Sequence, residues 1–344
     1  MTSQPLIEVD DLSVHFAITG RGLIRRTKGL VRAVDGVSFT IERGETLGLV
    51  GESGSGKTTA GRAILKAVPA TGGTIRFNRD DRQVDLATLN GEPLRQFRRH
   101  MQLIFQDPYA SLNPRMTVRD IIAEPLEVNN PGLSKAEIND RVRETAEMCR
   151  LNLEHLRRFP HAFSGGQRQR ICIARALVSK PDFVVCDESV SALDVSIQAD
   201  IINLLMDLQQ QLGLTYLFIA HDLSVVAQIS TRVAVMYVGR LAELAPARAL
   251  FERPMHPYTK ALMSAVPSID PDKEFDPVAM DGEIPNPADP PPGCRFNTRC
   301  PFAKDRCRAE VPDWRQIAPG HSVACHYAEE LSASDRSSSN GAPN

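Results

Sequence analysis

Short apolar runs alternate along the chain with longer segments in which apolar residues recur at helical spacing. The clearest runs are 46–50, 183–186 and 215–220, and polar residues are rare within them. They lack the alternation of a strand with one wet face, so they predict strands buried on both faces. Segments with helical spacing, such as 138–151 and 197–212, are also present. This order predicts an α/β fold with a largely parallel sheet covered on both sides.

Outside these runs the first half of the chain has weaker patterns. Residues 6–18 and 30–50 predict short strands on either side of a basic, glycine-containing insertion at 20–29, which we interpret as a solvated hairpin. Residues 74–105 predict further short strands, the last at 102–105. The pattern then becomes helical from 107 to 163.

The character of the chain changes after residue 266. Prolines accumulate there and predict an extended linker that cannot form a regular helix. They are Pro267, Pro271, Pro277, Pro285, Pro287 and Pro290–Pro292. Residues 331–344 are rich in Ser, Asn and Gly and predict a disordered tail. We therefore expect a main domain over 1–265, an extension over 266–330 and a tail over 331–344.

Composition narrows the function mainly by exclusion. The 344 residues carry a formal net charge of −2, so no global electrostatic argument points to nucleic acid. No apolar run approaches the roughly 18–20 residues that span a bilayer. Residues 1–10 include the acidic Glu8 and Asp10 and lack the basic-then-apolar pattern of a signal peptide. We expect a cytoplasmic protein whose role at a membrane, if it has one, depends on a separate partner.

The segment from Gly51 to Thr58 has the sequence GESGSGKT, which fits a P-loop. Glycines let successive amides point at phosphate oxygens, Lys57 supplies a positive charge, and the Thr58 hydroxyl binds Mg²⁺. The helix that follows adds its positive end. Candidate nucleotide contacts here are Gly51, Ser53, Gly54, Ser55, Gly56, Lys57, Thr58 and Thr59.

Polar residues follow three of the predicted strands. Asp187 and Glu188 end one apolar run, Gln106 follows the strand at 102–105, and His221 follows the strand at 215–220. The carboxyl ends of parallel strands meet at one edge of a sheet, where ligands bind. Asp187 and Gln106 are candidate Mg²⁺ ligands, and Glu188 is a candidate base for the attacking water. His221 is a candidate γ-phosphate contact.

A second glycine-rich element, Ser164-Gly165-Gly166-Gln167, opens a helix predicted over 167–178. Its amides form an additional phosphate site, which one P-loop core does not need. This surplus indicates an ATPase that a second subunit completes.

Together these residues resemble the ATP-binding cassette (ABC) family over about 6–265. Its motifs occur in order: Walker A at 51–58, the Q-loop at Gln106, the signature at 164–167, Walker B at 183–188, the D-loop at 191–194 and the H-loop at His221. The resemblance implies a P-loop core with an antiparallel β subdomain and a helical signature subdomain. It also implies a head-to-tail dimer that binds ATP between the Walker A of one chain and the signature of the other.

Three further residues enter through this resemblance. Phe16 is the candidate for stacking on adenine, and Asp194 belongs to the D-loop. Ser189 stands where the family commonly has proline, which leaves the position of Glu188 less firmly fixed by its own backbone. We still expect an active ATPase, with modest turnover.

Two segments are similar to the ATPase subunits of oligopeptide and dipeptide importers: 105–115 and 256–262. Residues 167–170 and 195–198 fit the same group, as does the cysteine-containing extension. The resemblance implies a second ATPase subunit, more often a different chain, and two membrane permeases. A groove of this chain, formed by the segment after Gln106 and the helical region 107–163, would receive the cytoplasmic helices of the permeases. An extracytoplasmic binding protein selects the peptide, and this chain lies at the cytoplasmic face of the membrane.

Four of the seven cysteines, Cys294, Cys300, Cys307 and Cys325, cluster near the end of the chain. Four thiolates in a compact segment suit a [4Fe–4S] cluster or tetrahedral zinc. Some members of the family carry a cluster here, which favours iron–sulfur. Zinc, with His321 or His326 as a further ligand, and metal-free thiols remain open. The other three cysteines, Cys149, Cys172 and Cys186, lie in apolar stretches and are expected to be buried.

Two other functions remain alternatives. A soluble ABC ATPase acting on ribosomes or nucleic acid usually has two cassettes or a long coiled-coil insertion, and the chain has neither. A non-catalytic nucleotide binder requires an ineffective Glu188. The exact cargo stays open among dipeptides, longer peptides, nickel complexes and other small solutes.

Overall fold

A computed structural model describes residues 4–19, 27–80, 82–130, 132–265, 280 and 282–332. Most of the predicted insertion, the prolines at 267, 271 and 277, and all but the first two residues of the predicted tail lie outside these ranges. The expectations for those segments therefore stay untested.

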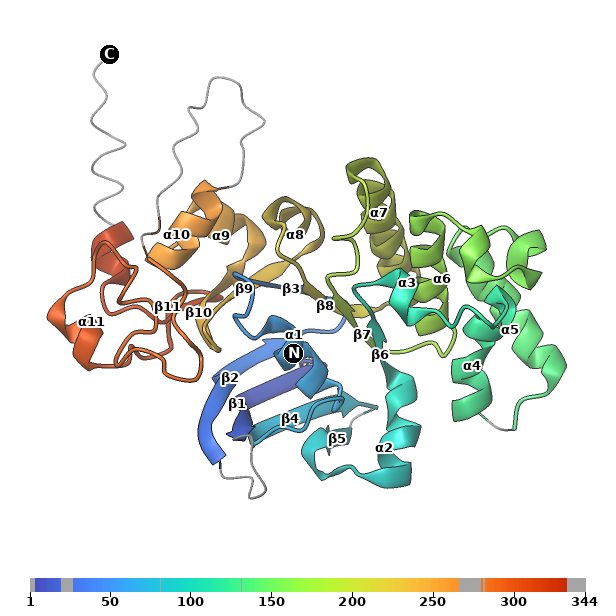
Figure 1. The fold of residues 1–344 in the computed structure, drawn as a ribbon, viewed down its shortest axis with the longest axis horizontal. Helices are drawn as coiled ribbons and strands as arrows, with labels where there is room; N and C mark the ends of the chain where they lie inside the picture. Colours follow the sequence, from blue (N-terminus) through green and yellow to red (C-terminus); the bar gives the residue numbers. More distant parts are fainter. Residues whose placement is uncertain are drawn as a thin grey trace, which may run out of the picture.

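The main sheet has eight strands in the order β11-β12-β10-β9-β3-β8-β7-β6 within the described residues (Figure 1). Neighbouring strands from β9 to β6 are parallel, which confirms the predicted parallel core. The other three are antiparallel to their neighbours. The bounds are β3 Thr46–Val50, β6 Met101–Ile104, β7 Phe183–Asp187, β8 Thr215–Ile219, β9 Arg232–Tyr237, β10 Arg240–Pro246, β11 Arg315–Ala318 and β12 His321–Val323.

A second, antiparallel sheet lies across from the main one, in the order β2-β1-β4-β5. Its strands are β1 Ile7–Thr19, β2 Thr27–Ile41, β4 Gly72–Arg79 and β5 Arg82–Asp85. Helix α1 (Lys57–Ile64) lies between the two sheets (Figure 1). The stretch predicted as one strand region at 30–50 forms two strands, because a turn at Gly44 (φ 71°) separates β2 from β3.

Helices α3 to α6 form an arm beside β6 and β7, and the C-terminal module lies at the opposite end of the molecule (Figure 1). The arm comprises α3 Pro108–Ser111, α4 Val118–Asn129, α5 Lys135–Met148 and α6 Gly165–Leu177. The remaining helices are α2 Gly91–Phe97, α7 Val195–Leu212, α8 Leu223–Ile229, α9 Ala247–Glu252, α10 Pro257–Ser264 and α11 Asp305–Ala309. Helix α2 was not predicted, since only strands were expected over 74–105.

Alternate residues of β7 show why both faces of the main sheet are apolar. Phe183 and Val185 belong to the core that contains α1, whereas Val184 and Cys186 belong to the core that contains α7. Side chains of a strand alternate between faces, so an uninterrupted apolar run fills both cores. Within the described part of the chain, the helices are too short or too polar to cross a membrane.

Candidate functional site

The loop between β3 and α1 surrounds the Lys57 side chain. The Lys57 Nζ donates to the carbonyl oxygens of Gly51 (2.7 Å) and Glu52 (2.9 Å), and the side chain is 5 % exposed. Gly56 has φ 105°, and a Cβ there would lie 2.1 Å from the carbonyl oxygen of Ala33, so only glycine fits. Burial lowers the pKa of Lys57, while the nearby Glu188, Asp187 and Glu52 act in the opposite direction. An anion bound here would restore the preference for the charged ammonium.

The other predicted contacts of this loop differ in exposure. Ser53 and Gly54 lie at its exposed tip, Ser55 is buried, and Thr59 lies half-buried in the first turn of α1.

Thr58 and Asp187, both predicted Mg²⁺ ligands, are in direct contact. The Thr58 Oγ1 donates to Asp187 Oδ1 at 2.8 Å. Asp187 ends β7 and is 1 % exposed, and Arg62 of α1 lies 3.3 Å from its other oxygen. A hydroxyl and a carboxylate are oxygen ligands of the kind that Mg²⁺ prefers. Arg62 was not predicted, because its contact joins residues 125 positions apart.

Glu188, Gln106 and His221 meet at the edge where β7, β6 and β8 end. The Gln106 Nε2 donates to Glu188 Oε2 at 2.7 Å, and His221 Nδ1 lies 3.5 Å from the same oxygen. The Glu188 backbone has φ 47° and its N–H donates to the carbonyl of Ile219 at 2.9 Å. The structure thus gathers two polar side chains from separate strand ends around the Glu188 carboxylate, an arrangement that suits a general base.

The signature element begins α6 as a capping box. Ser164 Oγ accepts from the Gln167 N–H, and the Gln167 side chain accepts from the Ser164 N–H at 3.1 Å. Helix α6 begins at Gly165, two residues earlier than predicted, because Ser164 is its N-cap. Ser164 and Gln167 are exposed, Gly165 is half-buried and Gly166 is buried.

The signature lies apart from the P-loop. Helix α6 packs against α3, α4, α5 and α7. Among the described residues, no hydrogen bond links Ser164–Gln167 to the P-loop. Asp194 caps the start of α7 and is exposed, and Phe16 on β1 is 44 % exposed. The polar cluster of one chain therefore contains Walker A, Walker B, Gln106 and His221, but not these residues.

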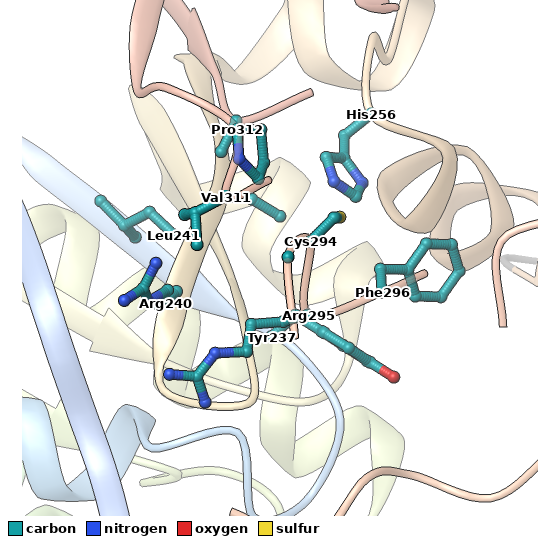
Figure 2. Close-up of a pocket in the computed structure, with 12 residues that line it drawn as sticks. Tyr237, Arg240, Leu241, His256, Cys294, Arg295, Phe296, Val311 and Pro312 are labelled. Carbon is teal, nitrogen blue, oxygen red and sulfur yellow. The ribbon is translucent and has the colours of Figure 1, made fainter. Parts of the chain in front are cut away.

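The four clustered cysteines line one small cavity. Burial, followed by the neighbouring cysteines, raises the pKa of Cys294 to about 12 and that of Cys325 to about 11. A second small cavity lies beside Cys294, between β9, β10 and the extension (Figure 2). Cys149, Cys172 and Cys186 are buried as predicted, and all seven cysteines are free.

The described residues give no support for a zinc site or for an iron–sulfur cluster. No group of three or more His, Cys, Asp or Glu side chains among them is arranged to hold a metal ion. His321, one suggested ligand, lies 2.6 Å from Glu243 Oε1 and is buried against it. His326 lines the cysteine cavity, but its Nε2 lies 3.0 Å from the carbonyl oxygen of Glu310.

The extension also reaches the P-loop, a contact that the sequence did not reveal. Arg299 binds Glu52 through two nitrogens, and the Tyr258 hydroxyl accepts from the Glu52 N–H. Tyr258 lies in a segment that the resemblance had selected, but no pattern pointed to Arg299 except its position beside Cys300.

Comparison with protein families gives two matches along the chain. The profile "ABC transporter" matches residues 34–191, and "Oligopeptide/dipeptide transporter, C-terminal region" matches residues 242–307. The oligopeptide transport ATP-binding protein AppF of Bacillus subtilis is 48 % identical over 330 residues, covering 94 % of this chain and 97 % of AppF. A putative peptide import ATP-binding protein of Brucella ovis is 51 % identical over 325 residues, covering 94 % and 98 %.

Solved structures are similar over the cassette. The ATP-binding cassette MJ0796, solved as a dimer in a post-hydrolysis state bound to ADP and Pi, superposes with a TM-score of 0.61 at 26 % identity. The match covers 70 % of this chain and 99 % of MJ0796.

A third sequence relative is the di/tripeptide transport ATP-binding protein DppF of Pseudomonas aeruginosa, which is 46 % identical over 95 % of this chain and 99 % of DppF. The chain belongs to the ABC transporter ATPases, in the group with an oligopeptide/dipeptide transporter C-terminal region.

Proposed function

We propose that the chain is the ATP-hydrolysing subunit of an importer of oligopeptides or dipeptides. One observation carries the proposal: Thr58 touches Asp187 while Gln106 and His221 surround Glu188, at one edge of the sheet. The names of AppF and DppF add the peptide cargo. The alternative, a soluble ABC ATPase acting on ribosomes or nucleic acid, receives no support from these relatives.

In this proposal each predicted site residue keeps its role. The Walker A residues bind the ATP phosphates, and Mg²⁺, which neutralises phosphate charge, is held by Thr58, Asp187 and Gln106. Glu188 takes a proton from the attacking water while the oxygen of that water bonds to the γ-phosphorus. ADP then leaves with the electrons of the broken P–O bond. His221 contacts the γ-phosphate. The signature of a second ATPase subunit completes the site of this chain. In return, Ser164–Gln167 and Asp194 of this chain complete the partner's site.

We further propose that 1–265 is the ATPase domain and 266–330 the extension. When two cassettes close on ATP, their motion would be transmitted to two permeases bound to the arm within 107–163. Exposed Phe105, Tyr109 and Phe159 on or beside this arm support a protein-binding face. The chain would lie peripherally on the cytoplasmic side of the membrane, and a separate binding protein would deliver peptide.

For the cysteines we propose a [4Fe–4S] cluster with a structural or sensory role. All four sulfur-bearing side chains line one cavity, which supports a shared cofactor. The resemblance to family members that carry a cluster at this place is what favours iron–sulfur over zinc. The cavity disfavours thiolates by itself, and a cationic cofactor would reverse that preference.

Hydrolysis is tested by Glu188→Gln in the assembled transporter. Removing the base should slow steady-state phosphate release by ~10²–10⁴-fold while ATP still binds. Glu252→Gln, on the exposed side of α9, serves as a control with the same chemical change. Unchanged turnover of the Glu188 variant would refute its role as the base.

The cluster is tested on protein purified without oxygen. We expect absorption near 400 nm together with iron and acid-labile sulfide, and loss of all three in Cys307→Ser. The buried Cys149→Ser serves as the control, since it lies outside the cysteine cavity. Stoichiometric zinc without iron, or protein free of both metals, would refute the proposal.

A further inference from the structure

The extension forms a buried, two-pronged ion pair with the P-loop. Arg299 Nη1 lies 2.7 Å from Glu52 Oε2, and Nη2 lies 3.1 Å from Oε1. The Arg299 side chain is 6 % exposed, and the Tyr237 hydroxyl lies 3.3 Å from Nη1. A forked arginine–carboxylate pair fixes direction as well as distance, so Arg299 specifies where the Glu52 side chain lies.

Helix α10 holds the same residue through its backbone. The Glu52 N–H donates to the hydroxyl of Tyr258 at 2.9 Å. Tyr258 is fully buried and packs against Tyr237 and Phe296, with ring centres 4.5 and 5.4 Å away. Phe296 belongs to the extension, so both contacts to Glu52 depend on the seam between the extension and the cassette.

The third polar group of Glu52 faces the nucleotide site. Its carbonyl oxygen accepts from Lys57 Nζ at 2.9 Å. Glu52 is thus bound at its side chain, its N–H and its carbonyl, and it is the second residue of a loop whose amides must point at phosphate. Small displacements of such a loop weaken binding strongly, because every amide is aimed by its neighbours.

We propose that Arg299 is a positioning residue for ATP: it reaches from the C-terminal extension and sets the P-loop through Glu52. This inference rests on the proposed ATP site at Walker A. The extension then contributes to nucleotide binding by its own chain as well as to any metal centre. Cys300 follows Arg299 directly, so the order of the cysteine segment and the aim of the P-loop are linked.

The first experiment measures binding of a fluorescent ATP analogue to the full-length chain. Arg299→Ala should weaken binding about 10-fold, within the range of about 5–150-fold typical of coupled sites, and Arg299→Lys should recover part of the loss. Arg306→Ala is the matched control, because Arg306 pairs with Glu310 on the exposed surface of the same module. In the assembled transporter KM should rise while kcat changes little, which marks lost binding. Wild-type affinity in Arg299→Ala would overturn the proposal.

A double-mutant cycle separates positioning from plain charge. Removing Glu52 takes a negative charge away from the phosphates, so electrostatics alone predicts tighter ATP binding by Glu52→Ala. Positioning predicts that Glu52→Ala binds more weakly and that Arg299→Ala/Glu52→Ala is no worse than the weaker single variant. Tighter binding by Glu52→Ala, or additive losses in the double variant, would overturn the proposal.

Lys57→Ala separates a failure of the proposed ATP site from a failure of the positioning role of Arg299. If it binds ATP like the wild type, the assignment of the nucleotide site itself fails. If it loses ATP while Arg299→Ala and Glu52→Ala keep wild-type affinity, the site stands and the positioning role is wrong. Circular dichroism of each variant confirms that the chain is folded, and Tyr258→Phe supplies a second route to the same loop should Arg299→Ala be unstable.

Discussion

Glu188 adopts a left-handed backbone (φ 47°), which L residues rarely occupy and which costs about 1–3 kcal/mol. Backbone hydrogen bonds on both sides offset this cost. The Glu188 N–H donates to Ile219, and its carbonyl accepts from the N–H and the hydroxyl of Ser191 at 3.2 and 3.0 Å. These bonds hold the carboxylate at the sheet edge even though Ser189 replaces the proline common in the family.

Ser189 itself gives a residue-scale prediction. Its side chain is 2 % exposed, and its hydroxyl has no hydrogen-bond partner among the described residues. A buried unpaired polar group costs about 1–3 kcal/mol. We expect Ser189→Ala to raise the free energy of unfolding by up to about 1 kcal/mol in urea denaturation.

The outcome for Ser189→Ala is diagnostic. A less stable variant would mean that the hydroxyl has a partner in solution, such as a bound water. Ser191→Ala is the contrasting variant, because its hydroxyl is bonded to Glu188 and its loss should destabilise the protein.

At the residue scale the sequence predicted groups that lie at strand ends and failed for long-range ion pairs. Gln106, Asp187, Glu188 and His221 could be placed because the end of each apolar run fixes where the next side chain emerges. Arg299 could not, since its partner is 247 positions away and no periodic pattern records such a contact.

At the element scale, α6 and α7 approach closely at Gly166. A Cβ on this glycine would lie 2.5 Å from Ile197 Cγ2, well inside normal contact distance. The second signature glycine thus serves packing within its own chain, in addition to its proposed role toward the partner's nucleotide.

We expect Gly166→Ala to lower the free energy of unfolding of the nucleotide-free protein by about 1–3 kcal/mol, as overpacking does. Ile197→Leu removes the clashing branch at Cβ and should restore part of the loss in the double variant. Gly132→Ala is the control, because nothing lies within 4 Å of its added methyl group. Thermal unfolding compares these four variants with the wild type, and strictly additive losses in the double variant would show that Ile197 is not the obstacle.

Elements with strong periodicity were predictable, and short ones were not. The apolar runs and the longer helices appeared near their predicted positions, because burial on defined faces leaves a regular pattern. The seven residues of α2, and β11 and β12 with four and three residues, are too short to show one. Strand β12 depends on pairing with β10, which lies about 80 residues earlier, and β11 pairs in turn with β12.

For the whole molecule, the separation of signature and P-loop predicts two different effects of one substitution. Ser164→Ala should leave ATP affinity of the isolated chain within about 2-fold of wild type. With the partner ATPase and permeases present, phosphate release should fall ~10-fold or more, as when a stabilising donor is lost. Fluorescent ATP titration and phosphate release measure the two quantities. Weakened binding by the isolated chain would place Ser164 in its own site.

The sequence divided the chain near residue 266, yet β12 continues the main sheet of the cassette. Glu243 of β10 pairs with Val323 of β12, and its carboxylate binds His321 and the N–H groups of Met255 and His256. Proline content marks a change in local backbone and carries no information about which strand a distant segment joins.

This strand addition also governs how the molecule behaves toward copies of itself. Without β11 and β12, the outer strand on that side would be β10, seven residues long and mostly buried, with unpaired N–H and C=O groups that invite stacking by other chains. The native border is instead β11, four residues long, where Arg315 is bound to Glu329. A protein cut before the extension should therefore form insoluble aggregates on expression, and the appended module doubles as a solubility device for the ATPase.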